Sequence, residues 1–541
     1  AMRVLGRPLH TGGNDSPRPA SQRAAAFILT AAMLTTLTAP AFADIWHIEN
    51  GDITVKAGDT EGTNKVSQGT IIDRVDTNTI ITNSDKDTAS SNTVTIEAKD
   101  KDDKVEVTLD NVNIKADSGS AITSKGDVTL TLKGDNSLTG GISDNGSYGL
   151  RGISSNGSLT ISGGETDSLT AQGGSGTYDG GSGIYSNSLT ISGGTVNATG
   201  GKSGADGSGG AGIHSGGVTI SGGSTVTANG GNGKDDYGGD GIYSSGGVTI
   251  SGGSTVTANG GNVSGAGIIS DGGVTISGGT VKAAGGDSKD GYGGDGIRSG
   301  GGVTISGNTV NAAGGNGGKV GGYGICSFDR VAISGGTVNA AGGNGGKVGG
   351  DGIYSNDIDL SGSLELTAKA GSPNGKALSQ KGSELDLDAI KDKLGPGAKV
   401  TATDADGKVI DQVPIPRPVE PEKPVIPEES SSSSDGGSAT QSAPASPLPG
   451  LTVTDKDGQR ISYTSTQSGN TLTVCVGRLT ASLRASLATL RQLRAEGIDT
   501  ITFQTILCST TLSVDELLAM GGEDAEAVLT HRLTASSLTV G

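Results

Sequence analysis

One four-residue pattern, Gly-Ile-x-Ser, recurs eight times in the middle of the chain and limits the fold more than any other feature. Its glycines are separated by 26 to 31 residues, which is the repeat length of a solenoid or a repeat array. Each repeat continues through two further short segments and ends in a glycine-rich loop of variable length. The pattern therefore predicts a stack of similar coils. The marker glycines are Gly152, Gly183, Gly212, Gly241, Gly267, Gly296, Gly324 and Gly352.

Apolar and polar residues alternate within each segment, which is the period of a half-buried strand and not of a helix. Gly-Gly pairs about every ten residues would also cost a helix about 1 kcal/mol per glycine. The predicted fold class is therefore all-β: a parallel β-helix solenoid with three short strands per coil and about 28–29 residues per coil. The residues predicted to point inward and to stack on their equivalents in the next coil are Ile242, Val248, Ile250, Val256 and Ala258.

The composition agrees with a narrow core. Only 32% of the 541 residues are hydrophobic and 3% aromatic, which is too little for several ordinary globular cores. Glycine, with 98 residues, supplies corners of positive φ and close approach of backbones. A calcium-binding nonapeptide β-roll is rejected because the period here is about 28 residues and not nine.

The N-terminal segment predicts export. Residues 1–43 have the features of a signal peptide, with basic residues, an apolar run from Ala24 to Ala39 and the small-x-small sequence Ala41-Phe42-Ala43. A membrane anchor would need a longer apolar run, and no second hydrophobic stretch follows, so we expect no membrane span. The predicted location is secreted, extracellular or at the bacterial cell surface.

Three further regions are predicted. Residues 44–400 form the β-helix, with Ile45, Trp46 and Ile48 in an N-terminal cap and segment 383–394, of helix-like spacing, closing the other end. Residues 401–449 form a Pro/Ser-rich linker. Residues 450–541 form a small α/β domain of unknown role. Its predicted strands are 471–476 and 500–507, and its predicted helices are 479–496 and 514–520.

Charge and cysteine content limit the partners. The formal net charge of −18 disfavours nucleic acid and anionic membranes and favours divalent cations. Three cysteines give no disulfide framework. Cys475 and Cys508 are the candidates for a disulfide in the C-terminal domain, and the sequence leaves their pairing open, whereas Cys326 is expected to be a small apolar filler in its repeat.

Aromatic residues suggest a sugar-binding surface. The residue between Ile and Ser of the marker is predicted to point outward, forming a column along the coils. Coils about 4.8 Å apart match the rise of one sugar unit in an extended glycan, so flat rings would offer a stacking track. The alternative is that tyrosine simply favours strands. The predicted ligand-binding residues are Tyr185, His214, Tyr243, Arg298 and Tyr354 in the column, with Tyr178, Tyr237, Tyr292 and Tyr323 just before the marker glycines.

The segment VEVTLDNVNIKADSGSAITSKGDVTLTLKGDNSLTGG, followed by repeated GGVTISGGTVNA and GIYS units, resembles the secreted carbohydrate-binding domain proteins of anaerobic bacteria. These are non-catalytic relatives of the pectate-lyase β-helix. The resemblance covers roughly residues 90–370. It implies a right-handed parallel β-helix that binds acidic or neutral extracellular polysaccharide and carries Ca²⁺ sites.

Acidic loops are the candidate metal site. Loop carboxylates and glycine carbonyls on stacked coils are the oxygen ligands that Ca²⁺ prefers. Solvated loop charge is the alternative explanation. The predicted calcium ligands are Asp235, Asp236 and Asp240 in one loop and Asp287, Asp290 and Asp295 in the next but one.

We expect no enzyme activity. A lyase of this fold would need an Arg or Lys base beside clustered carboxylates, and the column neighbours of Arg298 are Ile269 and Cys326, which are not acids. Three alternatives to glycan binding stay open: a pectate-lyase-like polysaccharide lyase, a surface adhesin or structural spacer, and an ice-binding solenoid. The last is suggested by rows of outward Thr and Ser residues, among them Thr219, Thr249 and Thr275.

Overall fold

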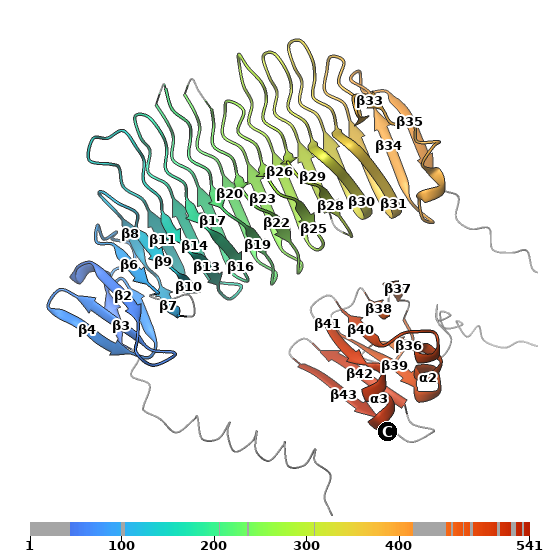
Figure 1. The fold of residues 1–541 in the computed structure, drawn as a ribbon, viewed down its shortest axis with the longest axis horizontal. Helices are drawn as coiled ribbons and strands as arrows, with labels where there is room; N and C mark the ends of the chain where they lie inside the picture. Colours follow the sequence, from blue (N-terminus) through green and yellow to red (C-terminus); the bar gives the residue numbers. More distant parts are fainter. Residues whose placement is uncertain are drawn as a thin grey trace, which may run out of the picture. The chain divides into compact units, whose positions relative to one another are not determined.

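The computed structural model describes residues 44–414 and 451–540, apart from residues 99–102, 205, 235, 236, 308, 456, 457, 462, 469, 477–479, 506–508, 521–525, 533 and 534. The predicted signal peptide and most of the predicted linker therefore lie outside the described residues. The chain divides into two compact units, one ending at Glu422 and one beginning at Lys423. Each unit is described by itself (Figure 1).

The first unit is a stack of coils in which the strands of each coil pair in parallel with their equivalents in the neighbouring coils, whereas short antiparallel strands are added at both ends (Figure 1). Its strands form three ladders. The first ladder holds β2 (Ile53–Ala57), β6 (Val94–Glu97), β9 (Ile122–Lys125), β12 (Ile153–Asn156), β15 (Ile184–Ser186), β18 (Ile213–Ser215), β21 (Ile242–Ser244), β24 (Ile268–Ser270), β27 (Ile297–Ser299) and β32 (Leu378–Gln380).

The second ladder holds β1 (Ile45–His47), β5 (Thr79–Thr82), β7 (Lys104–Asp110), β10 (Asp127–Lys133), β13 (Ser158–Ser162), β16 (Ser188–Ile191), β19 (Val218–Ile220), β22 (Val248–Ile250), β25 (Val274–Ile276) and β28 (Val303–Ile305). The third ladder holds β8 (Asn113–Lys115), β11 (Asp135–Thr139), β14 (Ser168–Gln172), β17 (Thr195–Thr199), β20 (Thr225–Asn229), β23 (Thr255–Asn259), β26 (Thr280–Ala284), β29 (Thr309–Ala313) and β34 (Lys399–Thr403). The long strands β30 (Ile325–Ala341) and β31 (Ile353–Lys369) take part in all three ladders.

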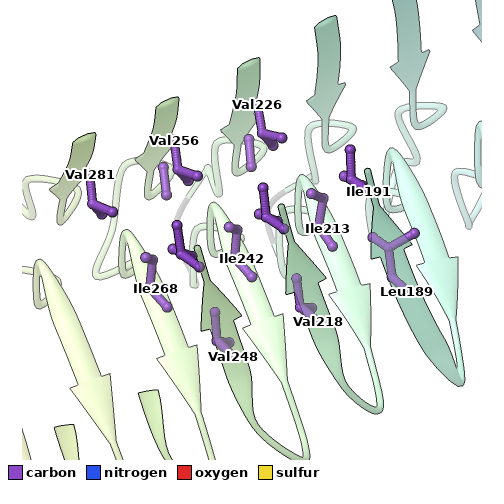
Figure 2. Close-up of a cluster of buried hydrophobic side chains, with 14 of the residues drawn as sticks. Leu189, Ile191, Ile213, Val218, Val226, Ile242, Val248, Val256, Ile268 and Val281 are labelled. Carbon is purple, nitrogen blue, oxygen red and sulfur yellow. The ribbon is translucent and has the colours of Figure 1, made fainter. Parts of the chain in front are cut away.

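The core is a narrow column of stacked aliphatic side chains. Ile220 is in register with Ile250, and Ile250 with Ile276. All five residues predicted to point inward are buried. Figure 2 shows such side chains from successive coils lying one behind the other between the strands. Since each coil adds only a few apolar residues to this shared column, a chain poor in hydrophobic residues still has a continuous core. The predicted parallel β-helix is confirmed.

The serine of the marker closes the corner between the first and second ladders. Ser270 is buried, and its hydroxyl donates to the carbonyls of Gly246, at 2.7 Å, and Gly273, at 3.2 Å. Ser299 repeats the arrangement one coil later, with Gly272 at 2.8 Å. The isoleucine of the marker fills the core while the serine binds corner carbonyls, which explains why both residue types recur together.

Glycine is required where the loops leave and rejoin the coils. A Cβ atom on Gly239 would lie 1.9 Å from the carbonyl oxygen of Gly210 in the preceding coil. At the corner between the second and third strands, Gly252 has φ of 64°. Both uses of glycine predicted from the sequence, close approach and positive φ, are therefore present.

The N-terminal end is capped by a short antiparallel extension. β3 (Asn64–Gln68) pairs with β2 and β4 (Ile71–Asp76) pairs with β3, and a single turn of 3₁₀ helix, η1 (Ile48–Asn50), follows β1. Trp46 is buried and its Nε1 donates to Asp76 at 2.9 Å. Ile48 is also buried, but Ile45 is exposed, so two of the three predicted capping residues cover the core.

The C-terminal end is closed by segment 383–394, but not as a helix. It contains β33 (Ser383–Glu384), turns and the 3₁₀ turn η2 (Lys391–Lys393). Leu387, Ile390 and Leu394 pack into the core cluster. A spacing of three and four residues would place these side chains on one side of a helix. Here successive turns direct all three into the core although no α-helix forms.

The predicted boundary at residue 400 falls inside β34. β34 pairs with β31 in parallel, and β35 (Val409–Pro414) pairs with β34 antiparallel. Val400 and Ala402 are buried like the equivalent residues of earlier coils. The sheet therefore continues to Pro414, because residues 399–403 keep the alternation of a third-ladder strand.

The described residues of the second unit form two four-stranded sheets and two helices. One sheet has the order β36-β39-β42-β43 and the other β37-β38-β40-β41. Its elements are β36 (Leu451–Thr454), β37 (Thr464–Ser468), β38 (Thr471–Cys475), β39 (Ala481–Ser486), α2 (Leu487–Ala495), β40 (Thr500–Gln504), β41 (Ser509–Ser513), α3 (Val514–Met520), β42 (Glu526–Arg532) and β43 (Ala535–Val540).

The helix predicted over 479–496 is wrong in its first half. Ala481, Leu483 and Ala485 are buried at a period of two, as in a strand, and they form β39. Ser486 then accepts a hydrogen bond from the backbone N–H of Thr489 at 3.2 Å and caps α2. Cys475 is a free thiol, and Cys508 lies outside the described residues.

Candidate functional site

The column predicted from the marker exists in register. Each residue between the Ile and the Ser of one marker pairs with the same position of the next coil. The paired residues are Tyr185, His214, Tyr243, Ile269, Arg298, Cys326 and Tyr354.

The first part of this column is packed against itself. The ring centroids of Tyr185 and His214 are 5.1 Å apart, and those of His214 and Tyr243 are 4.7 Å apart. The guanidinium of Arg151 lies 3.9 Å from the centre of the Tyr185 ring. We call these four residues the ring stack. Each ring contacts its neighbours along the column, and all three ring side chains are half-buried, so they are less open to a ligand than fully exposed rings.

The column then loses its rings. Ile269 follows Tyr243, and Cys326, predicted to point outward in the column, is fully buried. Burial raises the pKa of the Cys326 thiol to about 12. The next ring in the column, Tyr354, stacks on Tyr323 with centroids 5.3 Å apart. The small Cys326 side chain thus acts as the apolar filler expected of a lone cysteine and does not point outward with the rest of the column.

A groove of about 530 Å³ opens beside Ile269 and Arg298. This volume is typical of ligand sites. Buried or half-buried residues just before the marker glycines form its floor, and residues of the loops, among them two exposed tyrosines, form its rim. The side chains that line it are Tyr237, Asp240, Ser264, Ala266, Ile269, Tyr292, Asp295, Arg298, Val320 and Tyr323.

The groove lies where one coil is shorter than its neighbours. Its loop, residues 260–266, has seven residues, whereas loops 230–240 and 285–295 have eleven each. The short loop turns through Val263 and Ser264, both with φ of 69°. Its backbone is held on both sides, since Val263 accepts from Gly238 and donates to Asp287, each at 2.7 Å. Because loop 260–266 is shorter than the loops on either side, it leaves a gap in the rim between them.

The rim presents open aromatic faces. Tyr237 is 63% exposed and Tyr292 is 62% exposed. They stand four residues before Gly241 and Gly296, so they occupy equivalent positions two coils apart. The Ser264 hydroxyl donates to the carbonyl oxygen of Tyr292 and ties the short loop to the next rim residue.

Two carboxylates and an arginine give the groove its polarity. Asp240 accepts the backbone N–H of Ala266, and Asp295 accepts that of Tyr323, each at 2.8 Å. Burial raises the pKa of each carboxyl to about 6, although these hydrogen bonds and Arg298 act in the opposite direction. The Arg298 guanidinium lies 3.7 Å from Asp295 and 5.2 Å from the Phe328 ring.

The structure thus gathers six of the predicted site residues in one groove and separates the others. Tyr185, His214 and Tyr243 belong to the ring stack. Tyr354 lies on Tyr323, and Tyr178 contacts Tyr148 edge-on at 5.9 Å. The six residues in the groove are Tyr237, Tyr292, Tyr323, Arg298, Asp240 and Asp295.

Sequence analysis missed four contributors. Arg151 directly precedes a marker glycine, and Tyr148 stands four residues before one, as Tyr237 does, so the register contains a signal for both. Ile269 and Ser264 line the groove only because their coil is short. The shorter step from Gly241 to Gly267, 26 residues, was the available signal.

The predicted calcium ligands do not form a metal cluster among the described residues. Within that part of the chain, no three His, Cys, Asp or Glu side chains lie close enough to hold an ion. Asp235 and Asp236 lie outside it. Asp287 accepts the backbone N–H of Asn316 at 2.7 Å, while Asp240 and Asp295 belong to the groove floor. Calcium binding stays a prediction.

The predicted threonine row is present on the second ladder. Its members pair coil by coil until Ala332 interrupts them. The row gives the ice-binding alternative a regular surface. Its predicted members are Thr190, Thr219, Thr249, Thr275 and Thr304, and Thr160 and Thr129 continue it in the preceding coils.

Comparison with known proteins agrees with the fold. The Beta helix repeat family matches residues 218–242, 248–268 and 274–297. No curated protein and no solved structure matches the chain. With the three ladders, the match makes this chain a parallel β-helix protein. Among the described residues, no helix has the length and apolar character needed to cross a membrane.

Proposed function

We propose that this protein is a non-catalytic polysaccharide-binding protein, secreted or held at the bacterial cell surface, and that the groove is its binding site. The observation that carries the proposal is the pair of exposed rim tyrosines, Tyr237 and Tyr292, above a polar floor. Exposed aromatic rings are scarce in this chain, which has only 3% aromatic residues.

The chemistry of the groove suits a sugar chain. The flat face of a tyrosine ring packs against the C–H face of a sugar ring, while the phenolic hydroxyl stays in water. Asp240 and Asp295 each keep lone pairs that accept from sugar hydroxyls, and Arg298 adds N–H donors. Ile269 contributes an apolar patch in the wall. Such a mixture of apolar surface and few polar groups is typical of ligand sites.

A glycan array probed with the full chain, with Ca²⁺ and with a chelator, tests this proposal. We expect binding to at least one class of extracellular polysaccharide and a loss of at least tenfold in the double variant Tyr237→Ala, Tyr292→Ala. Tyr178→Ala is the matched control, since Tyr178 is an exposed tyrosine outside the groove. Absence of binding to every glycan, or equal losses in the control, would reject the proposal and favour the adhesin or spacer alternative.

A second candidate function, a polysaccharide lyase, is favoured by one observation. The column neighbours of Arg298 are not acids, but Asp295 lies 3.7 Å from it and Asp240 lines the same groove. An arginine beside carboxylates is the arrangement that such an enzyme needs. Incubation with pectin and Ca²⁺, followed by absorbance of unsaturated product, separates the two functions. Product that disappears in Arg298→Gln would replace the non-catalytic proposal.

A further inference from the structure

We infer that the groove selects an extended glycan whose repeating unit is two sugars, lying along the solenoid axis between the column and the loop rim. The inference deepens the proposed function, on which it rests, by naming the geometry of the chain that fits.

The first argument is that the groove runs along the axis. Its floor consists of the residues that directly precede four successive marker glycines, namely Asp240, Ala266, Asp295 and Tyr323. Equivalent residues of successive coils lie about 4.8 Å apart. This spacing matches the rise of one sugar in an extended glycan. One sugar per coil therefore fits along this floor.

The second argument is that the functional groups of the groove alternate. Carboxylates stand on the floor at Asp240 and Asp295, with the small Ala266 between them. Rim tyrosines stand at Tyr237 and Tyr292, above the same two coils, and the intervening short loop contributes no ring. Floor and rim thus share a period of two coils, about 9.6 Å.

This period of two coils determines which glycan fits the groove. In a flat chain with a two-fold screw axis, as in β-1,4-linked glucan, the same ring face and the same hydroxyls return at every second sugar. Such a chain would meet a tyrosine face and a carboxylate acceptor at each return. In a chain with three sugars per turn, as in α-1,4-linked galacturonan, sugars two positions apart have different orientations. The sugar at the second tyrosine would therefore be turned relative to the sugar at the first. The alternation therefore favours the two-fold chain.

The third argument is that the groove ends within the solenoid. Beyond Tyr323, the ring of Tyr354 covers that of Tyr323, and Cys326 is buried. At the other end, the column residue next to Ile269 is Tyr243, which belongs to the ring stack and does not line the groove. The groove thus holds a short stretch of chain, so binding is expected to stop improving beyond about four sugars, one for each floor residue.

The test uses calorimetry on the full chain with three soluble probes: β-1,4-glucan tetramer, β-1,4-glucan hexamer and α-1,4-galacturonan hexamer. We expect the glucan hexamer to bind at least tenfold tighter than the galacturonan hexamer, and within threefold of the glucan tetramer. Galacturonan binding as tight as or tighter than glucan would overturn the inference and leave the proposed function intact. Failure of all glycans on the array would reject both.

A spacing variant separates period from aromatic content. Tyr292 pairs with Val320 of the next coil, so the double variant Tyr292→Val, Val320→Tyr keeps two rim tyrosines and sets them three coils apart. We expect it to bind the glucan hexamer as weakly as Tyr292→Val alone, at least fivefold below wild type. Recovery of wild-type affinity in the double variant would show that spacing is irrelevant. Circular dichroism spectra and melting temperatures of all variants check that the coils remain folded.

Discussion

The ring stack and the groove lie on the same surface of the same repeat, yet they have opposite character. In the ring stack, every coil contributes a large side chain to the column, and Tyr185, His214 and Tyr243 contact one another. In the groove, Ile269 interrupts the rings, and a loop shortened to seven residues opens the rim. Where the repeat is regular, side chains of neighbouring coils contact one another. Where a coil departs from the repeat, side chains are left open to solvent.

This difference shows where function enters a solenoid. Stacking places equivalent residues together, so consecutive aromatic residues satisfy one another and stabilise the stack. A ligand needs side chains that are held in position but lack a partner. Within the described part of the chain, Tyr237 and Tyr292 are highly exposed, and the short loop 260–266 lies between them.

The largest stability effect is expected at the groove floor. Burial raises the pKa of Asp295 from 3.8 to about 6, so the folded state binds its proton more tightly than the unfolded state. Stability is therefore lost as pH rises from about 4 to about 6, and it stays lower above that range. We expect Asp295→Asn to stabilise the chain by about 2 kcal/mol near pH 7.5, with little change near pH 4.

Thermal denaturation followed by circular dichroism at both pH values measures this effect. Asparagine keeps an oxygen that accepts the Tyr323 N–H, so the hydrogen bond to the next coil is retained. An equal gain at both pH values would contradict the assignment, because the benefit would then not come from removing a buried charge.

An intermediate effect is expected from the aromatic residues. Tyr185→Ala removes the contacts with His214 and Arg151, and we expect it to cost about 1 to 2 kcal/mol. Tyr237→Ala removes a ring that is 63% exposed, and its change in stability is expected to stay within about 0.5 kcal/mol. Urea denaturation of the two variants beside wild type compares them. If Tyr237→Ala proved the more destabilising, the contrast between stack and groove would be wrong.

The smallest expected effect is a loss of stability at low pH that comes from His214 in the ring stack. Burial and the nearby charge of Arg151 lower the pKa of His214. Stability from this group is therefore lost as pH falls below about 6.5, the opposite direction to Asp295. Partial exposure limits the effect to below about 1 kcal/mol. His214→Phe should flatten this part of the pH profile while keeping the stack; an unchanged profile would show that His214 does not titrate in this range.

Much of the fold can be predicted from the sequence because every coil has the same structural requirements, so the same residue types recur at the same positions. Ile, Ser and Gly return at fixed offsets since each coil needs a core residue, a corner donor and a close approach of backbones. The site follows only in part. Tyr237, Tyr292 and Arg298 are chosen by residue type, but nothing in their spacing shows that Tyr185 and His214 cover each other while Tyr237 stays open.

The sequence by itself determined the period, the inward residues, most of the outward residues and the place where a coil is shorter; Cys326, predicted to point outward in the column, is buried. Periodicity can carry this information because it depends only on which positions repeat. The tertiary structure alone decided which outward residues meet, since that depends on side-chain size and loop length in adjacent coils. It also assigned Asp240 to the same groove as Asp295 and Arg298. Asp295 and Arg298 are three residues apart in one coil, but Asp240 belongs to an earlier coil and reaches them only because the coils are stacked.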